Sequence, residues 1–175
     1  MNPYFPQNVF KYCPRCGGRH FVAFGEKANK CQDCGFVFYF NAATAVAVII
    51  RDSQNRVLLT KRAFDPGKGT FDLPGGFVDP LEQAETAVDR EIREELNLKI
   101  TSKKYLGSFP NTYLYGGIIY FTCDMVFDCT VETLQGITAT DDVSGYEFLE
   151  ITEDVISKVG AESIKNILRA FCLPR

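Results

Sequence analysis

The segment from Gln83 to Leu96 combines a helical repeat with acidic residues at positions where a helix normally places apolar ones. On a helical wheel, Glu91 and Glu95 fall inside the apolar face and Glu94 lies at its edge. That face is defined by Ala84, Ala87, Val88, Ile92 and Leu96. Partly buried, unpaired carboxylates are costly, and acids in the last helical turn oppose the helix dipole. We therefore expect positive charge next to these carboxylates.

Two sources of positive charge are open. One or more hard divalent cations bound through oxygen, Mg²⁺ by preference, would reverse each of these penalties. Alternatively, Arg90 and Arg93 of the same segment neutralise the acids. We expect both guanidinium groups to point largely toward the opposite face of the helix, which favours bound metal.

The same segment resembles a known sequence motif. Residues 76–98, GFVDPLEQAETAVDREIREELNL, look like the Nudix box, G-x5-E-x7-R-E-U-x-E-E-x-G-U, where U is a bulky aliphatic residue. The matching positions are Gly76, Glu82, Arg90, Glu91, Ile92, Glu94, Glu95 and Leu98. Asn97 stands where the family has glycine, and asparagine also tolerates the left-handed conformation that ends a helix. We therefore expect the loop–helix–loop shape of the box to be preserved.

The resemblance implies a fold and a reaction. Nudix proteins are α/β/α sandwiches with a mixed sheet that hydrolyse a nucleoside diphosphate linked to another moiety. Carried onto this chain, the pattern implies that Glu91 and Glu95 bind Mg²⁺ or Mn²⁺ and that the Gly75 carbonyl completes the metal shell. Glu94 would share a metal or orient water, so Glu94 and Glu95 are candidate catalytic residues.

Three further positions of the box have implied structural roles. Gly76 opens the motif, and Glu82 and Arg90 would brace its loop against its helix. The alternative to an enzyme is a non-hydrolysing nucleotide sensor, or an interaction protein that uses its N-terminal region, on the same fold.

Outside the box, several residues are candidates for the same site. Asp142, and less strongly Asp141, precede a strand pattern and match the loop from which family members contribute an extra catalytic carboxylate; both could equally be ordinary loop acids. Arg62 is a candidate phosphate contact or a surface arginine. Aromatic rings that could stack on a base are Phe109, Tyr113 and Tyr115, although aromatics beside strands are more often core residues.

Four of the seven cysteines form a regular pattern near the N-terminus. Cys13 and Cys16, then Cys31 and Cys34, form two C-x2-C pairs separated by fourteen residues, and a glycine follows each pair. This spacing is typical of a tetrahedral zinc site with four cysteine ligands, which is structural because it leaves no open position for water. Four unrelated buried cysteines, or a redox pair, are the alternatives. His20 lies between the pairs and is expected to be structural or solvated.

A cysteine-rich ribbon before a Nudix domain resembles the NADH pyrophosphatase branch and relatives near the ADP-ribose and FAD hydrolases. The run S-Q-P-W-P-F-P-x-S of the NADH branch is reduced here to residues 108–112, and the chain has no tryptophan. NADH specificity is therefore not favoured. We expect a zinc ribbon over residues 1–40 and a Nudix domain over residues 41–175.

Composition limits the class of protein. With 175 residues, 46% of them hydrophobic, the chain is long enough for one globular domain and a small appendage. The net charge of −3 shows no broad basic surplus, so we expect a small-molecule nucleotide as partner rather than nucleic acid. No membrane span or secretory signal is evident, so a cytoplasmic location is expected. A homodimer is compatible with the sequence.

Local patterns predict the main elements. Strands are expected at residues 45–50 and 57–60, joined as a hairpin, and at 104–106, 117–129 and 146–151. Helices are expected at 83–96 and 161–171. Because strands and helices alternate without a regular βαβ rhythm, we expect a mixed sheet flanked by helices.

Overall fold

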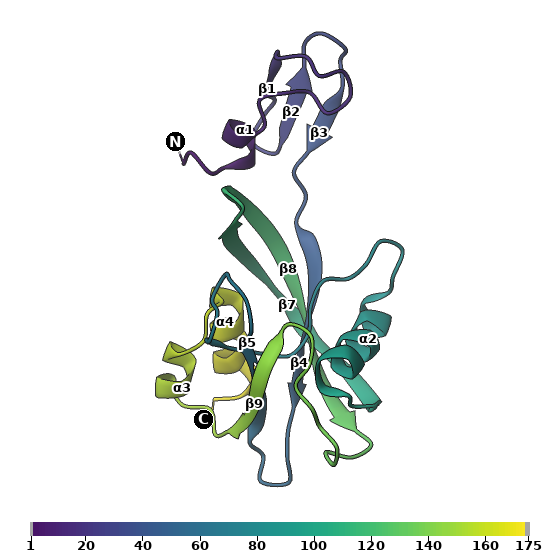
Figure 1. Ribbon diagram of the computed structural model, residues 1–175, viewed down its shortest axis with the longest axis vertical. Helices are drawn as coiled ribbons and strands as arrows, with labels where there is room; N and C mark the ends of the chain where they lie inside the picture. Colours follow the sequence, from purple (N-terminus) through teal and green to yellow (C-terminus); the bar gives the residue numbers. More distant parts are fainter. Residues whose placement is uncertain (1, 174–175) are drawn as a thin grey trace. The chain divides into compact units, whose positions relative to one another are not determined.

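The computed structural model describes residues 2–173 and divides them into two compact units (Figure 1). The first unit comprises the chain up to residue 42 together with residues 112–121, and the second comprises residues 43–111 and those from 122 onward. Residues 112–121, the tip of a long hairpin, had been expected to belong with the Nudix region. Met1 and residues 174–175, at the ends of the two expected domain ranges, lie outside the described residues.

The second unit contains a parallel strand pair among antiparallel ones. Strand β4 (Ala43–Ile50) runs parallel to β8 (Ile118–Val131), which is followed in the sheet by β7 (Ile100–Tyr115). A second sheet places β5 (Val57–Arg62) between β6 (Phe71–Asp72) and β9 (Val143–Leu149), antiparallel to both. The expected mixed arrangement of strands is confirmed.

The hairpin expected between β4 and β5 forms only at its turn. Asp52 N–H donates to the Arg56 carbonyl at 3.0 Å, and a single bridge joins Arg51 to Val57. Beyond it the two strands enter different sheets, so this part of the prediction was wrong. One edge of β4 pairs with β8, and on its other edge Val46 and Val48 donate to carbonyls of the 74–76 loop, which leaves no edge for β5.

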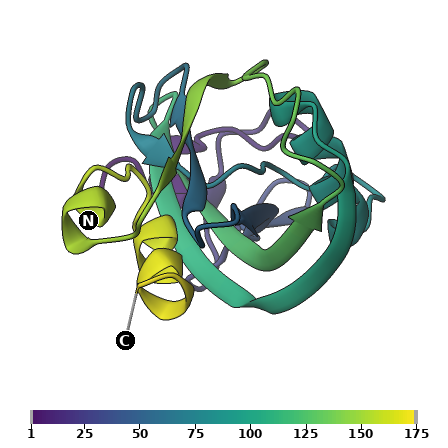
Figure 2. The same cartoon turned by 90° about the horizontal axis from the view of Figure 1, so that it is seen from below.

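Helices cover the strands of this unit on two sides (Figure 2). Alternate residues of β4 supply two separate cores, as a strand buried on both faces must. One core packs against α2 (Ala84–Leu96), and the other packs against α3 (Glu153–Ser157) and α4 (Glu162–Phe171). This is the α/β/α layering that the resemblance to Nudix proteins implied.

Helix boundaries follow local signals. Helix α2 begins after Gln83 and ends at Asn97, whose φ of 54° and ψ of 35° are left-handed, as expected for the residue that replaces glycine. Helix α4 confirms the last expected helix. Helix α3 was not predicted, because five residues are too few to show a periodicity; Thr152 caps it by accepting from Val155 N–H at 3.3 Å. No helix in residues 2–173 is long and apolar enough to span a bilayer.

The first unit is built around a small antiparallel sheet. Strands β1 (Phe21–Ala23), β2 (Ala28–Cys31) and β3 (Val37–Tyr39) pair in sequence order, and the short helix α1 (Pro6–Val9) precedes them. Its buried centre contains Cys13, Phe21 and Cys31. Residues 112–121 join this unit through contacts near its N-terminus, including Phe121 edge-on to Phe5 at 5.4 Å. Because two of these three core residues are cysteines, we expect the unit to be stabilised through bonds to their sulfur atoms.

Candidate functional site

The loop that follows β6 lies close against both β4 and α2 because of two glycines. A Cβ on Gly75, whose φ is +137°, would lie 2.1 Å from the Val46 carbonyl oxygen. A Cβ on Gly76 would lie 2.6 Å from Oε1 of Glu91. No side chain fits at Gly75, because its Cβ would meet backbone, whereas a Cβ at Gly76 would displace the Glu91 carboxylate. The two glycines thus let the loop approach the carboxylates of α2.

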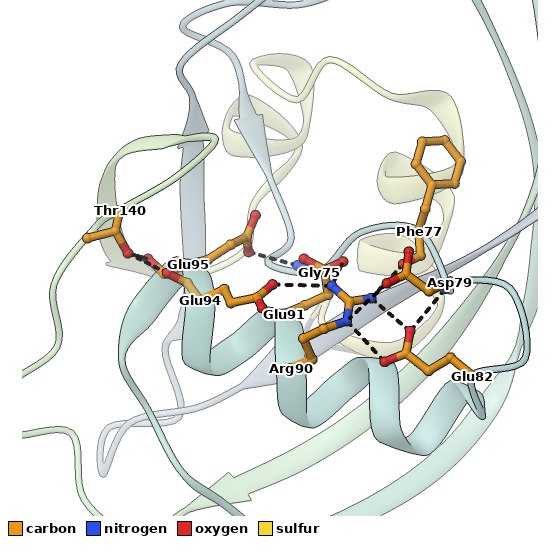
Figure 3. Close-up of polar contacts among 9 residues, drawn as sticks. All are labelled: Gly75, Phe77, Asp79, Glu82, Arg90, Glu91, Glu94, Glu95 and Thr140. Carbon is orange, nitrogen blue, oxygen red and sulfur yellow. Dashed lines mark hydrogen bonds and ion pairs between the residues drawn. The ribbon is translucent and has the colours of Figure 1, made fainter.

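Glu95 is buried, as the helical wheel predicted, with only 7% of its surface exposed. Its Oε2 accepts a hydrogen bond from Gly75 N–H at 3.0 Å (Figure 3). Within residues 2–173, no lysine or arginine forms an ion pair with it. Burial raises the pKa of Glu95 to about 8, and the nearby charge of Glu91 adds to the shift. At neutral pH without a cation, this carboxyl group is therefore mostly protonated.

Arg90 joins the loop to the helix through Glu82. Its Nε and Nη2 donate to the two Glu82 oxygens at 3.0 and 2.8 Å, and Nη2 also donates to the Phe77 carbonyl at 2.9 Å. Glu82 accepts in addition from Asp79 N–H at 3.0 Å. The hydrogen bonds from Arg90 lower the pKa of Glu82 to about 2. These are the contacts that a brace between loop and helix requires.

Arg90 also reaches the acidic face, contrary to expectation. Its Nη1 donates to Glu91 at 2.8 Å and to Glu94 at 3.2 Å. The wheel places the Arg90 Cβ on the polar face, but a long flexible side chain can carry its charged group well away from that direction. Burial nevertheless raises the pKa of Glu91. Arg93 forms no ion pair with these acids among residues 2–173, where Arg90 supplies this partial neutralisation.

The loop before β9 brings two more carboxylates to the cluster. Thr140 N–H donates to the Glu95 carbonyl at 2.9 Å, and the Thr140 hydroxyl donates to the Glu94 carbonyl. This anchoring places Asp141 and Asp142 close enough that their charges raise the pKa values of Glu91 and Glu95, respectively. The structure thus brings both candidate loop acids to the site.

Asp72 is a member of the cluster that the sequence analysis missed. It lies in β6, where burial raises its pKa, and its charge raises the pKa of Glu95 in turn. Arg62 Nη1 donates to it at 3.0 Å, and Arg62 Nε donates to the Pro66 carbonyl at 2.7 Å. An aspartate between two apolar residues, Phe71 and Leu73, was the available signal.

The candidate stacking rings each pack against another aromatic ring. Phe109 packs edge-on against Phe171 of α4 at 6.0 Å, in the core on the α3–α4 side. Tyr113 belongs to the first unit and stacks on Tyr120 at 5.6 Å, and Tyr115 packs against the same ring. Phe109 is a core residue here, which was the alternative that the sequence left open.

The four cysteines converge on one point. The Sγ atoms of Cys13 and Cys34 lie 3.7 Å apart, those of Cys16 and Cys31 lie 3.6 Å apart, and all four lie within 4.8 Å of one another. A tetrahedral site with bonds of about 2.3 Å requires sulfur atoms about 3.8 Å apart. His20 is not a member of this cluster, and its Nδ1 forms a hydrogen bond with Asp33 Oδ1 at 2.8 Å. The cluster is suited to a metal ion.

Comparison with known proteins agrees with this geometry. The model of the NUDIX domain matches residues 41–171. The chain belongs to the Nudix family. It is 30% identical over 116 residues to the NAD-capped RNA hydrolase NudC of Vibrio cholerae, covering 66% of this chain and 42% of that protein. Another NudC, from Haemophilus influenzae strain PittGG, is 32% identical over 111 residues, covering 61% and 42%. The chain spans less than half the length of these curated relatives.

Solved structures confirm the fold. A NUDIX hydrolase from Nitrosomonas europaea superposes with a TM-score of 0.64 at 21% identity, over 93% of this chain and 90% of that one. The NUDIX domain of Shewanella oneidensis NrtR, complexed with ADP ribose, gives 0.59 at 20% identity, over 74% and 86%. At these identities the likeness concerns the fold alone.

Proposed function

We propose that the chain hydrolyses the pyrophosphate bond of a nucleoside diphosphate linked to another moiety, with Mg²⁺ or Mn²⁺ as cofactor. The observation that carries the proposal is Glu95, a buried carboxyl group with one backbone donor and no cationic partner in the described residues. A buried carboxyl of this kind is stabilised either by a proton or by a bound cation.

The residues fit a hard divalent cation by their chemistry. Glu91, Glu94 and Glu95 offer carboxylate oxygens, the ligands that Mg²⁺ and Mn²⁺ prefer. The carbonyls of Pro74 and Gly76 are used by β4, so the Gly75 carbonyl is the one of the three available to complete the shell. Glu91 and Glu94 would have to exchange Arg90 for the metal. When bound, the cation would neutralise charge on the non-bridging oxygens of the pyrophosphate.

The chain's own residues would then handle water and phosphate. The water oxygen bonds to one phosphorus while the bridging oxygen leaves with the other phosphate, and a carboxylate accepts the water proton. Glu94, Glu95 and Asp142 are the proposed catalytic carboxylates. Arg62 uses Nε and Nη1 within the protein, so a substrate phosphate would meet its Nη2.

The substrate class is a dinucleotide-like diphosphate such as ADP-ribose, NADH or FAD. Two comparisons support this: the curated relatives are named NAD-capped RNA hydrolases, and the NrtR domain is complexed with ADP ribose. Because those relatives are named for an RNA, the expectation that nucleic acid is not a partner stays a prediction.

A second candidate is a nucleotide sensor that binds without hydrolysis. The ion pairs from Arg90 to Glu91 and Glu94 favour it, because they occupy oxygens that a catalytic metal needs. Product formation separates the two functions.

The test measures AMP formation from ADP-ribose, NADH and FAD with Mg²⁺ or Mn²⁺. We expect turnover of at least one substrate and a loss of at least about 100-fold in kcat for Glu95→Gln. Glu85→Gln, an exposed glutamate of the same helix, is the matched control and should retain full activity. Equal rates for wild type and Glu95→Gln would contradict the catalytic assignment.

We also propose that the cysteine cluster holds Zn²⁺ and that residues 1–40 form a structural ribbon, with residues 41–175 as the Nudix domain. Sulfur distances of 3.6 and 3.7 Å support a tetrahedral thiolate site, whose edges they match, and the C-x2-C spacing is typical of zinc.

A further inference from the structure

Charge is divided unequally between the two units. The first unit has five lysines and arginines against two acids, a net charge of +3, while the whole chain carries −3. The positive residues are Lys11, Arg15, Arg19, Lys27 and Lys30. The remainder of the chain therefore carries −6. The whole chain has no basic surplus, but the first unit taken by itself does.

The first unit also exposes most of the chain's large apolar side chains. Of fourteen such residues in the described chain, ten lie in this unit, although it contains less than a third of the residues. Most are aromatic: Tyr4, Phe10, Tyr12, Phe24, Phe38, Tyr39, Tyr115 and Tyr120. Where such side chains lie next to one another on the surface, they form a candidate interaction surface.

One face of the small sheet combines rings and charge. Lys30 of β2 pairs with Val22 of β1 and Val37 of β3, so these three residues form one row across the sheet. In the next row, Ala28 pairs with Tyr39. Phe24 N–H donates to the Ala28 carbonyl at 2.8 Å, which adds Phe24 to that second row. Alternate residues of a strand share a face. Val22, Phe24, Lys30, Val37 and Tyr39 therefore form one surface, here called the aromatic face.

The rings of the aromatic face are exposed, although Ala28, which lies between them on the same face, is buried. Phe24 and Tyr39 are 50% and 58% exposed, whereas Phe21 and Cys31, on the opposite face, are buried in the core of the unit. Lys30 Nζ lies 5.4 Å from the centre of the Phe24 ring. A cation held above an exposed ring can reach the phosphate of a nucleotide whose base stacks on that ring.

We propose that the aromatic face binds single-stranded nucleic acid. Flat exposed rings accept unpaired bases of any sequence, and Lys30 can meet a backbone phosphate, within a unit whose net charge is +3. An acidic peptide would use the charge but not the rings, and a duplex keeps its bases stacked within itself. The inference goes beyond the proposed hydrolysis, because binding here requires neither a pyrophosphate nor the carboxylates of α2.

The experiment titrates the 175-residue chain, loaded with zinc, into a fluorescein-labelled, single-stranded 12-nucleotide RNA of mixed sequence and follows fluorescence anisotropy. We expect saturable binding, with Phe24→Ala and Tyr39→Ala each weakening Kd about 5- to 100-fold. The slope of log Kd against log salt concentration should fall by about 0.7 in Lys30→Gln, as expected for one lost phosphate contact on a single strand.

Matched controls come from the second unit. Tyr105→Ala, at another half-exposed ring, and Lys104→Gln should each leave Kd within about twofold of wild type. Zinc content should be unchanged in every variant, which separates lost contacts from an unfolded ribbon.

Several results would overturn the proposal. These are no binding of the RNA, no effect of Phe24→Ala and Tyr39→Ala, equal affinity for duplex RNA or a poly-glutamate peptide, or a dimer in solution that Tyr39→Ala dissociates. RNA binding without AMP formation would contradict the proposed hydrolysis alone, and AMP formation without RNA binding would contradict this inference alone.

Discussion

At the residue scale, the buried carboxyl group of Glu95 links stability to pH. Its pKa is about 8 in the folded chain and 4.5 for the free side chain. Between these values the unfolded chain loses the proton while the folded chain retains it, so stability falls as pH rises. Glu82, with a pKa of about 2, acts oppositely: its contribution is present above pH 4.5 and is lost as pH falls toward 2.

We therefore predict that, without Mg²⁺ or Mn²⁺, the free energy of unfolding is greatest near pH 5 and falls by about 2–5 kcal/mol by pH 8. Urea denaturation at several pH values measures this, without chelator so that the cysteine site stays loaded. In Glu95→Gln the decrease should largely disappear; an unchanged decrease would assign it to other groups.

Substitution of the two loop glycines should have two different effects, one on stability and one on activity. A Cβ at Gly75 would clash with the backbone of β4, and the alanine would have to adopt a positive φ. Gly75→Ala should therefore destabilise the fold by about 3 kcal/mol or more. A Cβ at Gly76 would meet the flexible end of Glu91, so Gly76→Ala should shift that carboxylate and abolish activity with little loss of stability. Thermal unfolding and AMP formation separate the outcomes. Gly145→Ala, which meets open space, is the control.

At the element scale, the end of α2 depends on a left-handed asparagine. Alanine at Asn97 would pay the full cost of the left-handed conformation, so Asn97→Ala should destabilise the protein by about 1 kcal/mol. Asn97→Gly should change stability by no more than a few tenths of a kcal/mol. Denaturation midpoints of the two variants test this; equal midpoints would show that the cap conformation does not limit stability.

Local sequence signals predicted the features that depend on interactions between neighbouring residues. Helix α2, its asparagine end and the burial of Glu95 follow from periodicity and cap chemistry. The separation of β4 from β5 could not be predicted in this way, because the segments that pair with the edges of β4 are distant from it in the sequence. The reach of Arg90 and the role of Asp72 likewise depend on side-chain direction and on tertiary neighbours, which a helical wheel does not contain.

At the scale of the whole molecule, average composition conceals the difference between the units. The net charge of −3 suggested that nucleic acid is not a partner, yet the first unit alone carries +3 and most of the exposed rings. Residues 112–121 extend this unit from a hairpin that begins and ends in the other unit. No sequence pattern signalled that assignment, because it rests on contacts between residues more than a hundred positions apart.

The small core of the first unit leads to a prediction about zinc. The first unit has a small core that includes two of the cysteines, so its fold should depend on the metal. We expect about one equivalent of zinc in the purified protein, and its removal should expose the amides of residues 10–38 to hydrogen exchange while α2 and α4 stay protected. Less than about a tenth of an equivalent would contradict the ribbon.

The most direct test of the account measures the protons released when Mn²⁺ binds. Calorimetric titrations at pH 7, in buffers of different ionisation enthalpy, give this number. If Glu95 exchanges its proton for a cation, each bound Mn²⁺ should release close to one proton, and Glu95→Gln should bind more weakly with almost none. Mn²⁺ binding of equal affinity and proton release in both proteins would contradict the account.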